Sequence, residues 1–220
     1  MRLKNYIVEV SVEEVKFVKN MIISKSKQLY NYFDSRDWVV TDKELISNLN
    51  KIFKDYNIIF SIGSYKKRLY ATIVEAEIDP DNTRVSVILP KKVSEFFRRF
   101  AKINKKEIFM DIGKNQFFSE LLNTLSHEYR HMIQIVDYPD IEFVGGESGE
   151  PTEVYLDNRS EIDSFSLQAA LEYLKLGKPG KIIKMYKEHF SDDHRKFRNF
   201  MKKVERYKKK LEKLNFDKVF

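Results

Sequence analysis

The stretch FFSELLNTLSHEYRHMIQIV, residues 117–136, decides the fold of this chain. Apolar side chains recur in it at intervals of three and four residues, which predicts one amphipathic helix over the whole stretch. The apolar stripe contains Leu122, Leu125, Tyr129, Met132 and Val136. Histidine, asparagine, threonine and glutamine side chains fall on the opposite face, so we expect that face to look out of the core toward a cleft.

The polar face of this helix carries His127-Glu128-Tyr129-Arg130-His131, the pattern H-E-x-x-H. Residues four apart share a helix face, so both histidines can bind one metal ion, while the glutamate, about 100° round the helix, lies beside that ion. The pattern therefore predicts a zinc (Zn²⁺) site with Glu128 placed as a base. The alternative is a pair of solvated histidines next to an unrelated glutamate.

A catalytic zinc ion needs a third protein ligand and one open position. The chain has no cysteine, so this ligand has to come from a histidine or a carboxylate. We predict Glu161, near the start of a helix that begins after Asn158 and ends near Leu176. A helix that runs back across the first would present its opening turn to His127 and His131. The competing candidates lie in the preceding loop and are Glu147, Glu150 and Glu153.

Two carboxylates stand close together in this second helix. Asp163 follows Glu161 by two residues and so points to another side of the helix. We expect Asp163 to accept a hydrogen bond from the N–H of a ligand histidine, or to be solvated. For Glu161 the alternative is structural, because the helix dipole favours a carboxylate near a helix N-terminus.

Three β-rich runs precede the H-E-x-x-H helix. They span residues 57–62, 68–74 and 83–89, and turn-forming residues separate them at 63–64 and 79–82. The runs predict a small, mostly antiparallel sheet. After the sheet, Ser94 is predicted to cap a helix over 96–103.

Two further helices are predicted before the sheet. Ser11 with Glu14, and Thr41 with Glu44, form capping-box patterns ahead of runs with helical apolar periodicity. The fold class is therefore α+β, with the small sheet packed on the H-E-x-x-H helix and the glutamate helix, and with extra N- and C-terminal helices.

The arrangement resembles the gluzincin metallopeptidases, which carry H-E-x-x-H on an active-site helix, a small sheet before it and a downstream helix with a glutamate ligand. The matched residues are His127, Glu128, His131 and Glu161. The segment EIDSFS, residues 161–166, is similar to the E-A-N-x-F-A helix of compact gluzincin-like peptidases of phages and mobile elements, with Asp163 in place of the asparagine. The resemblance covers residues 57–176. Metzincins differ, because Asp137 stands where their third histidine would be.

This resemblance implies a zinc-dependent peptidase that acts on a protein or peptide substrate. Zinc would lower the pKa of its bound water toward 7, and Glu128 would take the proton and deliver it to the leaving amine. Tyr155, in the loop before the glutamate helix, is a candidate donor to the oxyanion. The run that contains Val85, Val87 and Leu89 is the expected edge strand, which would hold an extended peptide through main-chain hydrogen bonds.

Basic residues gather at the end of the chain. Residues 181–220 carry 14 Lys and Arg against 6 Asp and Glu, a net charge of +8, whereas the whole chain has +7. From Lys196 to Lys218 apolar residues recur every three or four positions, which predicts a docked amphipathic helix with a solvated basic face. A nucleic acid or another acidic partner could bind to that face. His189 and His194, five apart, are expected to be solvated.

These patterns divide the chain into an N-terminal helical segment (1–56), a zincin-like core (57–176) and a basic helical extension (177–220). A hydrophobic fraction of 42% predicts a folded chain and not a disordered one. The sequence has no signal-peptide pattern and no apolar run of about 18 residues, which predicts a cytoplasmic protein, with a virion or host-cell location as the alternative. The alternative function is a nucleic-acid- or partner-binding protein that uses the basic helix and keeps a structural or vestigial metal site.

Overall fold

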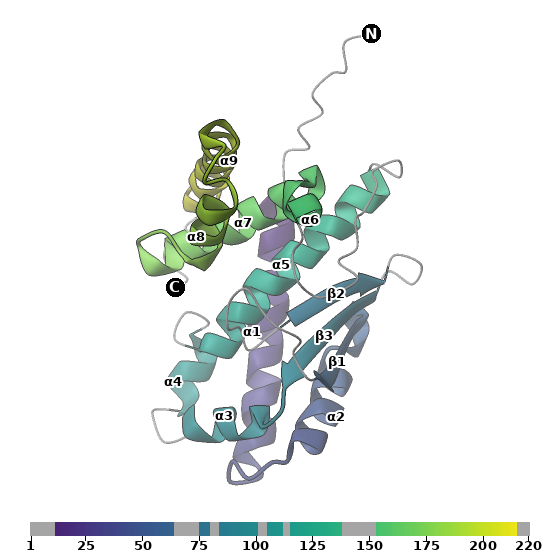
Figure 1. The fold of residues 1–220 in the computed structure, drawn as a ribbon. Helices are drawn as coiled ribbons and strands as arrows, with labels where there is room; N and C mark the ends of the chain where they lie inside the picture. The colour runs from purple at the N-terminus through teal and green to yellow at the C-terminus, as the bar shows by residue number, and fades with distance from the viewer. Residues whose placement is uncertain are drawn as a thin grey trace.

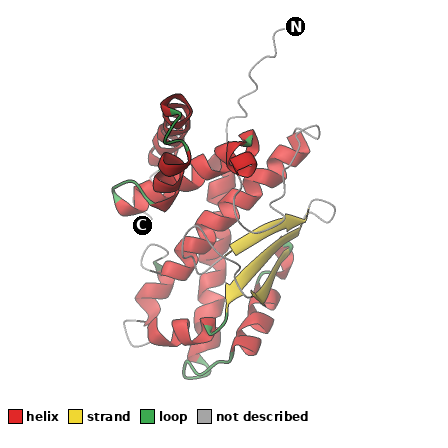
Figure 2. Cartoon of the chain, viewed as in Figure 1, coloured by secondary structure: helices red, strands yellow, loops and turns green. Residues whose placement is uncertain are grey.

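The computed structural model describes residues 12–63, 75–79, 84–100, 105–111, 115–137 and 153–214. Helices predominate, and a three-stranded sheet lies at one side of the molecule (Figures 1 and 2). The predicted α+β class is thus confirmed. The third-ligand candidates Glu147 and Glu150 and the predicted strand at 68–74 lie outside the described residues.

The two N-terminal helices form as predicted. They are α1 (Val12–Asp34) and α2 (Asp42–Ile52), followed by the short 3₁₀ helix η1 (Lys54–Tyr56). Thr41 and Glu44 make the complete capping box, because each side chain bonds to the backbone N–H of the other residue. Ser11, the predicted cap of α1, lies outside the described residues.

The sheet is mixed, which corrects the prediction of a mostly antiparallel one. Its strands are β1 (Ile58–Gly63), β2 (Glu75–Asp79) and β3 (Arg84–Pro90), in the order β1-β3-β2. Only residues 80–83 separate β2 from β3, and these two strands pair antiparallel, as a short connection requires. The longer segment 64–74 follows β1, which pairs with β3 in the parallel direction.

The strand that carries Val85, Val87 and Leu89 is central, so the prediction of an edge strand there was wrong. β3 is paired on both sides, and all three side chains are buried. Strand propensity reports burial and not position in a sheet, which explains the error. The outer edge of β1 is covered by α2, since the Asn50 amide bonds to the backbone N–H and C=O of Phe60, at 2.6 and 3.0 Å. The other edge of the described sheet is β2.

A short helical segment connects the sheet to the H-E-x-x-H helix. It contains α3 (Val93–Phe100) and α4 (Lys105–Met110), of which α4 was not predicted. Ser94 lies inside α3 and does not cap a helix that begins at residue 96. Its backbone N–H and its hydroxyl both donate to Asp42 Oδ1, at 2.9 and 2.6 Å. The carboxylate at the start of α2 therefore holds the start of α3.

The remaining helices are α5 (Gln116–Asp137), α6 (Glu153–Asp157), α7 (Arg159–Leu176), α8 (Lys181–His189) and α9 (His194–Glu212). In Figure 1, α5 passes beside the sheet and then meets α7, while α6 to α9 gather at the far end of the molecule. None of the described helices is both long and apolar enough to cross a bilayer.

Two hydrophobic cores hold these elements. The first joins α1 and α2 to the sheet, α3, α4 and α5, with Phe97 packed edge-on against Phe117 at 4.8 Å between ring centroids. The second joins α6 to α9, with the rings of Tyr186 and Phe200 stacked at 4.2 Å. Both cores contain residues from either side of a predicted segment boundary, at 56/57 and at 176/177.

Candidate metal centre

Three side chains from two helices meet at one point. His127 and His131 project from α5, and Glu161 projects from the first turn of α7. The two Nε2 atoms are 3.0 Å apart, Glu161 Oε2 lies 3.4 Å from His127 Nε2, and Glu161 Oε1 lies 3.2 Å from His131 Nε2. The structure thus brings together the three ligands predicted from the sequence.

These separations suit a tetrahedral metal ion. Zinc bonds of 2.0–2.1 Å to nitrogen and oxygen place neighbouring ligand atoms roughly 3.3 Å apart. In addition, Glu161 Oε2 is buried and makes no hydrogen bond. A buried carboxylate oxygen without a hydrogen bond is costly, and a cation removes that cost. The residues present therefore fit a bound zinc ion.

Burial and mutual contact set the charges of the three groups. Burial lowers the pKa of His127 below its ordinary value. Burial also acts to lower the pKa of His131, but the hydrogen bond and charge of Glu161 outweigh it and raise that pKa. For Glu161, burial acts to raise the carboxyl pKa, yet the two histidines outweigh it and hold the pKa well below its usual range. The carboxylate is thus charged, and a metal would compete with a proton at His131.

The orientation of His131 follows from Gln134, one turn further along α5. The Gln134 amide nitrogen lies 3.4 Å from two groups that can only accept, the Ser160 carbonyl and Asp163 Oδ2. The amide oxygen therefore faces His131 Nδ1, at 2.9 Å. Since an amide oxygen can only accept, Nδ1 of His131 carries a proton, and in the neutral ring Nε2 is left as the metal-binding atom.

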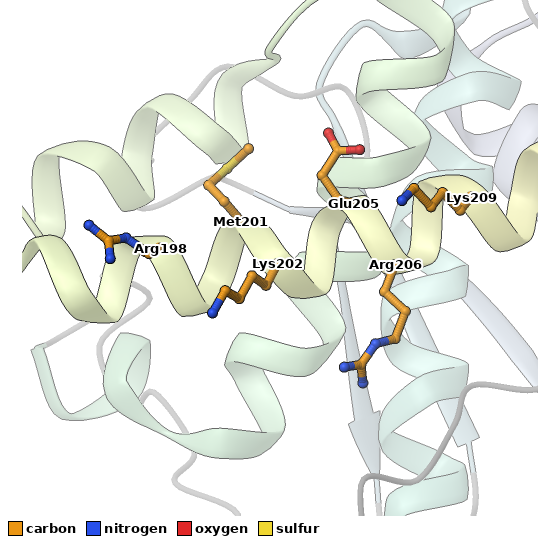
Figure 3. Close-up of a pocket in the computed structure, with 6 residues that line it drawn as sticks. All are labelled: Arg198, Met201, Lys202, Glu205, Arg206 and Lys209. Carbon is orange, nitrogen blue, oxygen red and sulfur yellow. The ribbon is translucent and has the colours of Figure 1, made fainter.

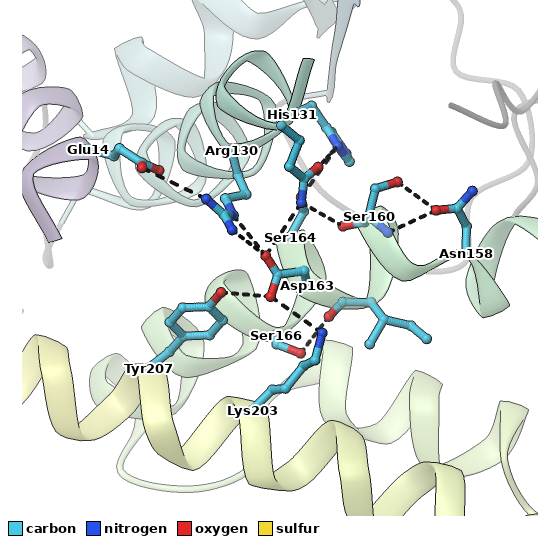
Figure 4. Close-up of polar contacts among 12 residues, drawn as sticks. Glu14, Arg130, His131, Asn158, Ser160, Asp163, Ser164, Ser166, Lys203 and Tyr207 are labelled. Carbon is cyan, nitrogen blue, oxygen red and sulfur yellow. Dashed lines mark hydrogen bonds and ion pairs between the residues drawn. The ribbon is translucent and has the colours of Figure 1, made fainter. Parts of the chain in front are cut away.

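Asp163 does not bond to a ligand histidine and is not solvated, so both predictions for it were wrong. Its carboxylate is buried between helices and accepts from Arg130 Nε and Nη2, at 2.8 and 2.7 Å, and from the Tyr207 hydroxyl, at 2.8 Å (Figure 4). Lys203 Nζ lies 3.5 Å away. Asp163 reaches His131 only indirectly, through the amide of Gln134.

This carboxylate also ties the N-terminal helix to the centre. Arg130 Nη1 lies 3.9 Å from Glu14 Oε1 on α1, while Tyr207 belongs to α9 (Figure 4). Neither Arg130 nor Tyr207 was predicted to have a role, although Arg130 stands inside the H-E-x-x-H pattern, and Glu14 was predicted only as a capping-box residue. Arg130 is one of the polar residues of that stretch. Its acceptor, Asp163, lies on α7, and no sequence pattern near Arg130 indicates this tertiary contact.

The polar face of α5 was expected to look out of the core toward a cleft, but the two histidines on it are buried, with exposed fractions of only 5% and 6%. The polar face of α5 is covered by α7, and the ring of Phe165 lies 4.5 Å from that of His127. Glu128, between the histidines in sequence, is also buried, at 8% exposure. The centre is therefore shielded on the sides that the structure describes.

Tyr155 lies in the short helix α6 and not in a loop. It is half-buried, and its ring packs edge-on against Phe165 at 6.2 Å. Tyr155 is thus next to the residue that covers His127, and its role as an oxyanion donor stays a prediction. Glu153, the competing ligand candidate, begins the same helix, and its side chain lies outside what the structure describes.

The other two histidines lie away from the centre. His189, at the end of α8, is half-buried and bonds to Asp157 Oδ1 at 2.9 Å, so the expectation that it is solvated was wrong. His194, the first residue of α9, is exposed as expected.

The chain matches no model of a known protein family, and it has no significant match among curated proteins or among solved structures.

Proposed function

We propose that this chain is a zinc-dependent peptidase. The observation that carries the proposal is the convergence of His127, His131 and Glu161, with a buried carboxylate oxygen that makes no hydrogen bond. Two imidazoles and one carboxylate form a donor set that suits zinc. When bound, zinc would supply the Lewis acidity that lowers the pKa of a water toward neutrality and polarises a carbonyl.

Glu128 is the proposed general base. It follows His127 on α5 and lies about 100° round the helix from His127 and about 60° from His131, so its carboxylate is beside the metal position and not part of it. Glu128 is buried, so little water surrounds its carboxylate. Glu128 would accept a proton from water and return it to the leaving amine.

The strand β2 replaces β3 as the proposed substrate strand. β2 forms an edge of the described sheet and packs beside α5, the helix that carries the two histidines. An extended peptide could pair with such an edge through main-chain hydrogen bonds. The substrate class is therefore an extended segment of a protein or peptide.

The test compares the parent chain with Glu128→Gln, both purified without metal-affinity resin. Zinc per chain is measured by elemental analysis, and cleavage is followed with a fluorescently labelled casein and with a mixed peptide library read by mass spectrometry. We expect about one zinc in both proteins and cleavage by the parent alone, reduced at least ~100-fold in the variant. Cleavage that persists in the variant would refute the role of Glu128, and zinc without any cleavage would favour a structural metal site.

A further inference from the structure

One face of α9 carries a continuous row of cationic side chains, which we call the basic stripe. It consists of Arg195, Arg198, Lys202, Arg206, Lys209 and Lys213, the last at the C-cap of the helix. At 100° per residue these six positions fall within about 80° of the helix circumference. From Arg195 to Lys213 there are 18 residue steps, or about 27 Å at 1.5 Å per residue.

The basic stripe is exposed, and the body of the protein does not neutralise it. All six residues are exposed, and none of them makes an ion pair in the part of the chain that the structure describes. The acidic residues of α9 are Glu205 and Glu212, at the border of the stripe, and Glu205 Oε2 lies 3.8 Å from Lys208. The stripe therefore presents six like charges that repel one another.

The opposite face of α9 is fixed to the protein. Phe200, Val204, Tyr207 and Leu211 are buried in the second core. Tyr207 also bonds to Asp163. The contacts of α9 with the protein therefore hold the stripe in a fixed position, so binding of a ligand would not cost the free energy of ordering this helix.

Beside the stripe lies an open hollow of about 510 Å³. Its lining includes four of the six cationic residues, with Met201 and Glu205, as Figure 3 shows along the length of α9. A shallow, cationic and elongated hollow suits an extended polyanion better than a small enclosed ligand.

We propose that the basic stripe binds the phosphate backbone of double-stranded DNA. This function goes beyond the proposed peptidase activity and does not depend on it. Three of the six residues are arginines, whose guanidinium groups bind phosphate oxygens in bidentate fashion. A duplex presents one phosphate charge per about 1.7 Å of its axis, so a 27 Å stripe faces several phosphates at once.

The structure favours duplex DNA over other polyanions. Single strands are bound through stacking on aromatic rings, but the aromatic residues of α9, Phe197, Phe200 and Tyr207, pack in or against the second core. The stripe lies on a helix, and the major groove of B-DNA is wide enough for a helix to reach the phosphates that flank it, whereas that of helical RNA is deep and narrow. A helix that lies in a membrane surface needs a free apolar face, but the apolar face of α9 is buried.

The experiment measures the binding of the full chain to a fluorescein-labelled 20-base-pair duplex by anisotropy at several KCl concentrations. Six phosphate contacts predict a slope of log K against log salt of about −5, and a Kd of roughly 1–100 µM near physiological salt. A quadruple Gln variant at Arg198, Lys202, Arg206 and Lys209 leaves two contacts, so we expect a slope of about −2 and affinity at least ~10-fold weaker at 0.1 M KCl.

A matched control removes four exposed lysines on α1, α2 and η1, namely Lys27, Lys43, Lys51 and Lys54, each changed to Gln. It has the same net charge as the stripe variant, and we expect it to bind DNA with less than a twofold loss. Circular dichroism and thermal unfolding verify that both variants keep the fold. Equal losses in the two variants, or a salt slope near zero, would overturn the proposal. So would tighter binding to a 20-nucleotide single strand, a 20-base-pair RNA duplex or anionic phosphatidylserine vesicles.

Discussion

Glu161 and Asp163 are two buried carboxylates on one turn of α7, but the groups that surround them differ. Asp163 accepts hydrogen bonds from Arg130 and Tyr207, and the Lys203 ammonium also lies within reach. Glu161, two residues earlier, faces two imidazoles and has one oxygen without a hydrogen bond. The environment of Asp163 is complete within the protein, whereas we propose that a cation completes that of Glu161.

This difference distinguishes a structural carboxylate from a candidate metal ligand. A buried charge that is fully paired holds helices in place, and α1, α5, α7 and α9 all contribute to the Asp163 cluster or its extension to Glu14. A buried charge that is incompletely paired is a candidate for binding. The Asp163 cluster and the candidate metal centre are neighbours, because Gln134 bonds to both His131 and Asp163. The cluster therefore helps to orient one candidate metal ligand.

The largest expected effect belongs to Asp163. In Asp163→Asn, the buried guanidinium of Arg130 loses its counter-charge, which we expect to lower the free energy of unfolding by about 3–5 kcal/mol. Urea denaturation of the metal-free proteins measures this loss. The double variant Asp163→Asn with Arg130→Met removes the unpaired charge and should recover part of the stability. A loss below about 1 kcal/mol in the single variant would contradict the structural role.

The second largest effect is expected for the corresponding change at the other carboxylate, Glu161→Gln. We expect its zinc affinity to fall at least ~100-fold, equivalent to about 2.7 kcal/mol, because a neutral amide replaces the only charged ligand. Competition with a chromogenic chelator measures the affinity. Glu172→Gln is the control, since Glu172 is a further partly buried carboxylate of α7 and does not belong to the centre. Unchanged zinc binding in Glu161→Gln would show that another carboxylate provides the third ligand.

The sequence predicted the centre far better than the sheet, for a physical reason. His127 and His131 lie in one helix with a fixed period, and Asn158 marks the start of the next helix, so Glu161 can be placed from local rules. Strand order depends instead on contacts between distant segments. Asn50 occupies one edge of β1, and β3 pairs with the other, although no residue pattern within the strands indicates either contact.

The prediction for Asp163 was wrong for the same reason as the prediction for the sheet. Helical spacing correctly placed Asp163 on another side of α7 from Glu161. It could not indicate the partners of Asp163, because Arg130 and Tyr207 belong to two other helices. The periodicity of a helix says which side a residue faces and not which helix lies there. The part of the centre that could be predicted is therefore the part held within single turns of α5 and α7.

A smaller effect on zinc binding is expected for Gln134, which bonds to both His131 and Asp163. Gln134→Leu removes the acceptor that fixes the His131 ring, and we expect zinc affinity to fall about tenfold. The d–d spectrum of the cobalt-substituted protein should change too, because it reports ligand geometry. Gln134→Glu keeps an acceptor at this position and should restore the spectrum. An unchanged spectrum in Gln134→Leu would mean that packing alone orients His131.

The smallest effect concerns Asp42, a carboxylate that is satisfied without any cation. Burial acts to raise its pKa, but hydrogen bonds from Ser94 and Lys92 outweigh burial and lower it. Because the pKa is lower in the folded chain, Asp42 stabilises the fold above its unfolded pKa of about 3.9, and this contribution is lost as pH falls through the folded pKa. Asp42→Asn should therefore cost about 1 kcal/mol at pH 7, since the group is only half-buried.

Urea denaturation of the parent and Asp42→Asn from pH 7 to pH 2.5 tests the sign of this effect. The difference in unfolding free energy should be constant at neutral pH and should shrink as the carboxyl of the parent takes up its proton. A difference that grows on acidification would mean that Asp42 is stabilised as the neutral acid. In that case hydrogen bonds without a cation would not suffice to keep a carboxylate charged in this fold, and the charge of Asp163 would depend on the two cations beside it, Arg130 and Lys203.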